Sequence, residues 1–102
     1  MIAPLAALLR LHEMTESSGL DPENNQQARL LQAINATAMR KYAIANRRFG
    51  AGSVVPMDRG VCSGCYMVQP ASLPELDEDI HQCTHCGRLI YDTDVAYELS
   101  VG

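Results

Sequence analysis

Two short motifs, Cys62-Ser63-Gly64-Cys65 and Cys83-Thr84-His85-Cys86, contain every cysteine of this 102-residue chain. Each CxxC turn directs two thiolates to one point, and Zn²⁺ accepts four ligands in a tetrahedron, so the C-x2-C-x17-C-x2-C spacing is typical of a zinc site. We call residues 62–65 the first CxxC motif and residues 83–86 the second. The pattern predicts one structural Zn²⁺ bound by Cys62, Cys65, Cys83 and Cys86. Gly64 and Gly87 are expected to take positive φ, which would let the backbone curl around the metal.

Other uses of these cysteines are weaker interpretations. Disulfides need an oxidising compartment, and nothing in the sequence suggests export. A redox pair needs a thioredoxin-like βαβ setting, and a catalytic zinc needs an open position that four thiolates would fill. His81 or His85 could replace one thiolate, but four sulfurs already suffice. No nucleophile, base and orienting group converge in the sequence, so we expect no enzymatic activity.

The composition favours a small metal-dependent unit in a reducing compartment. Hydrophobic residues make up 47% of the chain, but there is one Phe and no Trp. A ribbon of this size would therefore draw much of its folding energy from the metal. The apolar run 2–9 is interrupted by Pro4 and lacks the features of a signal peptide. No segment approaches membrane-spanning length. The expected location is cytoplasmic, with no membrane partner.

Residues 1–49 are expected to form an antiparallel two-helix hairpin. Pro4 suits a first helical turn and Gly19 a helix end, which predicts a first helix over residues 4–18. Asp21 followed by Pro22 is a start signal for a second helix over residues 22–49. Apolar residues recur there at spacings of three and four, as on one face of a helix. They are Leu31, Ile34, Ala38, Tyr42, Ala45 and Phe49.

The two expected helices differ in length, about 22 Å against about 42 Å. The first helix can therefore cover only part of the second, and the stripe from Ala38 to Phe49 needs another cover. Either the C-terminal part folds back on it, or a second copy packs there as a homodimer. Partial exposure of an Ala-rich stripe is the third reading.

The C-terminal half is expected to be a zinc ribbon. Residues 50–56 form a hinge and linker, and residues 57–102 the ribbon, so the predicted fold is a small α+β protein with separate helical and ribbon parts. On this division the helices should survive loss of the ribbon. Strands are expected near residues 54–57, 61–68, 82, 88–91 and 95–101, with Leu89 and Tyr91 on one face and Ile90 on the other. Leu73, Leu76 and Ile80 are expected to cover the metal site.

Charge is distributed unevenly along the chain. Residues 1–49 carry six basic and four acidic residues, whereas residues 50–102 carry two basic and eight acidic ones. The acidic ribbon suits a phosphate backbone poorly. A basic group formed by Arg40, Lys41, Arg47 and Arg48 closes the second helix. Its simplest role is favourable pairing with the helix C-terminus. Its functional interpretation is a patch for an anionic partner, to which Arg59 and Arg88 could add.

Several segments together resemble the bacterial C4-type zinc-ribbon family, in which a long helical hairpin carries a C-terminal ribbon. The resemblance lies in Arg48-Phe49-Gly50, residues 54–57, residues 60–67, Leu73-Pro74, Leu76 and residues 83–91, of which the C-x-x-C-G-R-x-x-Y ending is the most specific part. It implies that Cys62, Cys65, Cys83 and Cys86 bind zinc. It also implies an adaptor or chaperone role, linked in that family to flagellar and type III secretion systems or to an alternative sigma factor. RNA binding has been proposed for some members. The hairpin of this chain is much shorter than the family's, so a partner cannot be carried over.

A second resemblance is to the DksA/TraR-type regulators of RNA polymerase, which combine similar cysteine spacing with a helical hairpin that has an acidic tip. Asp21 and Glu23 would form that tip here. The residues after Cys86 match the C4-type family better, and the first helix is short for reaching a deep channel. The sequence thus favours a non-enzymatic adaptor that binds a protein partner. A nucleic-acid-binding ribbon and a polymerase regulator are the alternatives.

Overall fold

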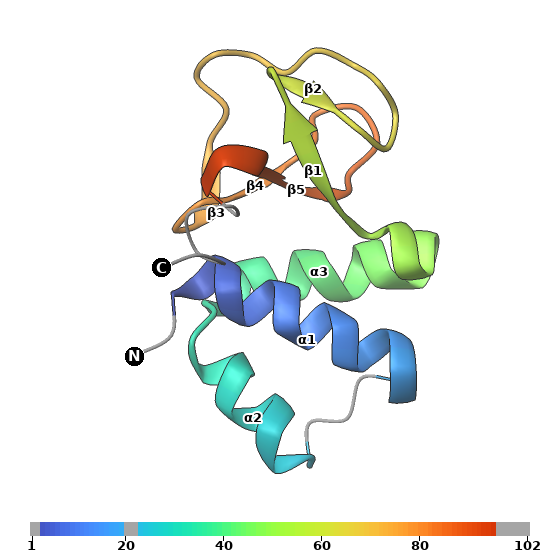
Figure 1. The fold of residues 1–102 in the computed structure, drawn as a ribbon, viewed down its shortest axis with the longest axis vertical. Coiled ribbons are helices and arrows are strands. Elements are labelled where there is room, and N and C mark those ends of the chain that lie inside the picture. The colour runs from blue at the N-terminus through green and yellow to red at the C-terminus, as the bar shows by residue number, and fades with distance from the viewer. Residues whose placement is uncertain (1–2, 20–22, 96–102) are drawn as a thin grey trace.

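The computed structural model describes residues 3–19 and 23–95 of the chain. Three α-helices lie against a five-stranded β-sheet, with the sheet above the helices in Figure 1. The predicted combination of helices and a sheet in a small protein is confirmed. The elements are α1 (Pro4–Ser18), α2 (Asn25–Gln32), α3 (Ala36–Phe49), the 3₁₀ turn η1 (Gly50–Gly52), β1 (Val54–Asp58), β2 (Val61–Cys62), β3 (Glu75–Asp77), β4 (Ile80–Gln82) and β5 (Leu89–Asp92).

Helix α1 has the predicted bounds. Pro4 occupies its first turn, where a missing N–H costs no hydrogen bond. Gly19 ends the helix with φ of 79°, and its N–H donates to the Thr15 carbonyl at 2.8 Å. Leu5, Leu8 and Leu11 are almost fully buried, so one face of the helix packs into the core.

The predicted single helix over residues 22–49 is wrong, because the chain forms two helices separated at residues 33–35. Asn35 has an extended backbone, and its Oδ1 accepts a hydrogen bond from the Ala38 N–H at 2.8 Å, so it caps α3. Its Nδ2 also donates to the Leu76 carbonyl at 2.7 Å, and its N–H donates to Asp77 Oδ2 at 2.6 Å. The break is therefore held by the sheet as well as by the cap, and three helices replace the predicted two-helix hairpin.

The start of the second helix also differs from the prediction. Asn24, rather than Asp21, caps α2, and its Oδ1 accepts from the N–H groups of Gln26 and Gln27. Asp21 and Pro22 themselves lie outside the described residues. Helix α2 thus begins at Asn25.

The strands lie in the order β2-β1-β5-β4-β3. β1 and β5 run parallel, whereas the β1–β2, β3–β4 and β4–β5 pairs are antiparallel. Of the hairpin expected over residues 61–68, only β2 is a strand, with an isolated bridge between Val61 and Val68. The C-terminal strand expected over 95–101 is wrong at Val95, because residues 93–95 begin a helical turn. Tyr97, Leu99 and Val101 lie outside the described residues.

The alternation in β5 gives the sheet two different faces. Leu89 is buried with the helices and Tyr91 packs on the same cluster, while Ile90 is buried with the cysteines, as predicted. Leu73 also packs with the cysteines, but Leu76 and Ile80 belong to the helix-side core, so their predicted place over the metal site is wrong. The sheet therefore separates a helix-side core from a cysteine-side core.

The helix-side core joins residues from both halves of the chain. Its buried members are Leu5, Ala7, Leu8, Leu11, Leu30, Ile34, Ala38, Tyr42, Ala45, Val54, Ile80 and Leu89. Tyr42 and Ala38 are fully buried, so the stripe on α3 is covered by α1 and by the sheet folding back on it. The apolar stripe that suggested a helix-mediated homodimer is therefore covered within a single chain. The domain boundaries at residues 49/50 and 56/57 remain a prediction.

In the part of the chain that the structure describes, no helix combines the length and apolar character needed to cross a bilayer.

Candidate metal centre

The fold brings the four cysteines together at the sheet face away from the helices. Cys62 ends β2, Cys65 lies in the following turn, and Cys83 and Cys86 lie between β4 and β5. All four Sγ atoms lie within 4.8 Å of one another. Among the described residues this is the one cluster of three or more such side chains that could hold a metal ion, and neither His81 nor His85 belongs to it.

The sulfur positions fit a tetrahedral metal. With Zn–S bonds of about 2.3 Å, the edge of a ZnS₄ tetrahedron is about 3.8 Å. The Cys62–Cys86 and Cys65–Cys83 Sγ distances are 3.9 Å and 3.5 Å. A disulfide needs about 2.05 Å. The four thiols are therefore unlinked and spaced as the four ligands of one ion.

The two CxxC motifs have the same backbone turn. The Tyr66 N–H donates to the Cys62 carbonyl at 2.7 Å, and the Gly87 N–H donates to the Cys83 carbonyl at 3.2 Å. Both residues have positive φ, 62° at Tyr66 and 85° at Gly87. The prediction for Gly87 is confirmed. The first motif places a tyrosine where the second places glycine.

The prediction for Gly64 is wrong, because Gly64 is not among the positive-φ residues. Its lack of a side chain instead makes room for an arginine. A Cβ atom at Gly64 would lie 2.5 Å from Cδ of Arg88 and 2.8 Å from its Nε. The Arg88 Nε also donates to the Gly52 carbonyl at 2.9 Å, so this side chain connects both motifs to the turn η1.

Hydrogen bonds to sulfur are most numerous at Cys83. Its Sγ accepts from the N–H groups of His85 and Cys86 at 3.4 and 3.5 Å, and from Gln69 Nε2 at 3.3 Å. Gln69 Oε1 in turn accepts from the Thr84 N–H at 3.1 Å. The buried Gln69 thus ties the chain after the first motif to the second motif, a role that no spacing signal in the sequence indicates.

These contacts set the protonation of the cluster. Burial would raise the pKa of Cys83, but hydrogen bonds from Cys86, His85 and the neighbouring thiols lower that pKa to about 6. Burial, together with hydrogen bonding to the other three thiols, raises the pKa of Cys65 to about 12, and burial also raises the pKa of Cys62. One sulfur is thus ready as a thiolate, and a metal would displace protons from Cys62 and Cys65.

The predicted basic patch divides in the structure. Arg40, Arg47 and Arg48 are exposed and Lys41 is half-buried. The Arg48 guanidinium lies 5.2 Å from the Phe49 ring centroid, and the Arg88 guanidinium lies 4.0 Å from the same centroid. Arg48 and Arg88 therefore lie against the same ring at the end of α3. The sequence indicated Arg88 only as a possible addition to the basic group.

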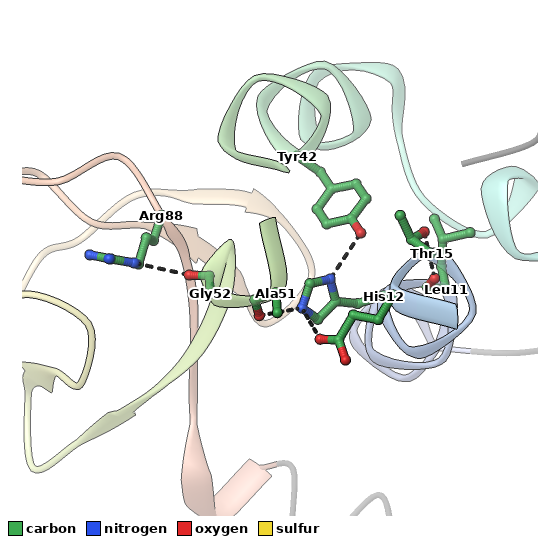
Figure 2. A network of polar contacts seen from close by, with 8 residues as sticks. Leu11, His12, Thr15, Tyr42, Ala51, Gly52 and Arg88 are labelled. Carbon is green, nitrogen blue, oxygen red and sulfur yellow. Dashed lines mark hydrogen bonds and ion pairs between the residues drawn. The ribbon is translucent and has the colours of Figure 1, made fainter. Parts of the chain in front are cut away.

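A buried polar network fixes the chain where α3 turns toward the sheet (Figure 2). His12 Nε2 lies 2.9 Å from the Ala51 carbonyl and 3.0 Å from Glu16 Oε1, and its Nδ1 lies 2.9 Å from the Tyr42 hydroxyl. Since both neighbours of Nε2 are acceptors, Nε2 carries a proton, and in neutral His12 the Tyr42 hydroxyl donates to Nδ1. Burial raises the pKa of Tyr42. The network holds η1 against α1, and with it the start of β1.

No protein-family model, curated protein or solved structure matches this chain.

Proposed function

We propose that the chain is a C4-type zinc-ribbon protein whose Cys62, Cys65, Cys83 and Cys86 bind one structural Zn²⁺. The observation that carries this proposal is the near-tetrahedral spacing of the four sulfurs. Bound zinc would supply folding energy by joining β2 to the turn between β4 and β5. Four thiolates leave no open position for a substrate, which supports a non-enzymatic role. Free thiolates persist in a reducing compartment, which supports a cytoplasmic location.

The surface that best supports binding of a protein partner directly follows the first motif. Tyr66, Met67 and Val68 are 76%, 45% and 70% exposed, and Ile44 on α3 is the remaining large exposed hydrophobic residue in the described part. Three consecutive exposed apolar side chains are unusual on a small protein and typical of a contact surface. We call residues 66–68 the apolar tip.

The backbone of the apolar tip supports the same interpretation. Tyr66 adopts a left-handed conformation that costs a non-glycine residue about 1–2 kcal/mol. Such strain is typical of residues held for function. In this proposal the zinc centre is a rigid support that presents Tyr66, Met67 and Val68 to an apolar pocket on a partner protein.

A matched pair of variants tests this role. Tyr66→Ser removes the centre of the tip, while Ile44→Ser removes an exposed apolar side chain of α3 as the control. Tagged proteins are used to capture partners from the source cells, and a captured protein is then purified and its binding measured directly. We expect the purified partner to bind the wild-type protein and Ile44→Ser, and to bind Tyr66→Ser at least tenfold more weakly. Equal binding by all three proteins would contradict a role for the tip.

A nucleic-acid-binding ribbon is the second candidate, and the meeting of Arg48 and Arg88 over Phe49 favours it. It predicts that affinity for a labelled single-stranded RNA falls steeply as salt increases. The DksA/TraR-type alternative gains less support, because the break at Asn35 removes the long helix that such a hairpin requires.

A further inference from the structure

Two arginines from distant parts of the sequence lie against one aromatic ring. Arg48 is in the last turn of α3, and Arg88 directly follows the second motif and Gly87. Their guanidinium carbons lie 5.2 Å and 4.0 Å from the Phe49 centroid. Within residues 3–19 and 23–95, neither arginine forms an ion pair with a carboxylate. Two like charges are thus held together without an acidic partner in the described part of the chain.

The Arg88 side chain lies against Gly64 of the first CxxC motif, and the Arg48 side chain approaches Gly87, which follows the second motif. The Arg88 side chain covers Gly64, where a Cβ atom would lie 2.8 Å from its Nη1. Nη1 of Arg48 lies 4.0 Å from the position of a Cβ at Gly87. Gly64 lies between Cys62 and Cys65, and Gly87 follows Cys86. Both positive charges therefore lie beside the backbone turns that hold the four sulfurs.

Two contacts fix the orientation of Arg88 in the fold. Its Nε donates to the Gly52 carbonyl, as Figure 2 shows, and its guanidinium stacks on Phe49. Fixing a long side chain normally costs conformational entropy. The two contacts offset that cost and hold the charge beside Gly64.

The sign and size of the charge match the zinc centre of the proposed function. Four thiolates around one Zn²⁺ carry a net charge of about −2. Two guanidinium groups supply the opposite charge. Opposite charges nearby stabilise the negatively charged, metal-bound form of the centre.

We propose that Arg48 and Arg88 are the charge-balancing pair of the four-thiolate centre and raise its affinity for zinc. This inference rests on the proposed zinc site and assigns Arg48 and Arg88 to it, in place of a free patch for an anionic partner. Arg88, which is fixed and closer to its motif, contributes more than Arg48.

Zinc competition with a coloured chelator tests the proposal in the full-length reduced protein. Arg88→Gln should weaken zinc binding about tenfold at low salt, equivalent to about 1.4 kcal/mol. Arg48→Gln should weaken it in the same direction but less. Arg47→Gln, which removes the same charge from the same helical turn without a contact to either glycine, should leave it unchanged. The loss should shrink in 1 M salt, where the Debye length is about 3 Å.

A lysine variant separates charge from packing. Arg88→Lys keeps the positive charge but loses the guanidinium contact with the Phe49 ring and the Nε hydrogen bond. A charge-balancing role predicts zinc affinity within about threefold of the wild type for this variant. Equal losses in Arg88→Lys and Arg88→Gln, unchanged by salt, would overturn the proposal in favour of a packing role.

The remaining outcomes are also distinct. Circular dichroism would show whether Arg88→Gln folds. If it does not, the exposed Arg48 provides the test. Equal zinc affinities of Arg48→Gln and Arg47→Gln would then overturn the charge-balancing role of the two arginines. A wild-type protein that binds no zinc would overturn the proposed function itself. Tight zinc binding that is identical in wild type, Arg48→Gln and Arg88→Gln would overturn only the charge-balancing role.

Discussion

The two CxxC motifs share one turn but differ in what surrounds it. The second motif is followed by Gly87, which adopts positive φ easily, and by Arg88, which reaches Gly52 and Phe49. The first motif reaches the same backbone conformation with Tyr66, which is 76% exposed. The second motif is thus anchored to the helices, while the first motif carries strain and an exposed apolar tip. Two motifs that supply equivalent ligands can therefore differ in role: the second is anchored to the helices, and the first presents the apolar tip to solvent.

Loss of a cysteine ligand from the second motif should have the largest effect on zinc binding and on folding. Cys83→Ser removes the sulfur with the most hydrogen bonds, and we expect loss of stoichiometric zinc and of the sheet. Because Val54, Ile80 and Leu89 share a core with α1 and α3, the helical circular dichroism signal should also fall. Retention of the full helical signal would show that the helices fold independently, as the sequence alone predicts.

Among the cysteines with shifted pKa values, Cys83 should be the last to be protonated as the pH falls. The pKa of Cys83 is lowered to about 6, so its thiolate favours the folded state. That contribution is complete above the unfolded value of about 9 and is lost as pH falls through about 6. In reduced metal-free protein whose sheet is retained, as circular dichroism would show, the ultraviolet thiolate absorbance should have a step near pH 6. Its presence in Cys83→Ser would assign the step to another cysteine.

Glycine substitutions should separate the two motifs by mechanism. Gly64→Ala places a methyl group 2.5 Å from Arg88 Cδ, so the arginine must leave Gly52, at a cost of about 1–3 kcal/mol. Gly87→Ala meets no atom closer than 3.9 Å but must adopt positive φ, which costs about 1–2 kcal/mol. Urea unfolding of the zinc-loaded proteins measures both. If Arg88→Ala restores the stability of Gly64→Ala but not that of Gly87→Ala, the two mechanisms are distinct.

The smallest effect on stability is expected at the apolar tip. Tyr66→Gly relieves a left-handed tyrosine but adds freedom to the unfolded chain, so stability should change by less than about 1 kcal/mol. The same urea measurement checks this. A loss of several kcal/mol would mean that Tyr66 packs as part of the structure and is not held for display.

The features that the sequence predicts correctly are those determined by local spacing. Cysteine spacing predicts the cluster, Pro4 and Gly19 bound α1, and alternation in residues 89–91 predicts the two faces of the sheet. Each of these depends on residues close together in the sequence or on one metal-binding geometry.

The features that sequence reasoning misses depend on contacts between distant residues. The break at Asn35 needs Leu76 and Asp77, which lie about forty positions away, and no Pro or Gly marks it. Gly64 is small because Arg88 lies over it, which a local φ argument cannot detect. In the sequence, Gln69 is an ordinary polar residue in a loop. Its role follows only from its contacts with Cys83 and Thr84 in the structure.

X-ray absorption spectroscopy at the zinc edge, on protein purified under reducing conditions, tests the central claim most directly. One zinc per chain with four sulfur neighbours at about 2.3 Å is the predicted result. A shell containing nitrogen or oxygen, or metal-free protein with disulfides among Cys62, Cys65, Cys83 and Cys86, would contradict the closed four-thiolate centre on which this account depends.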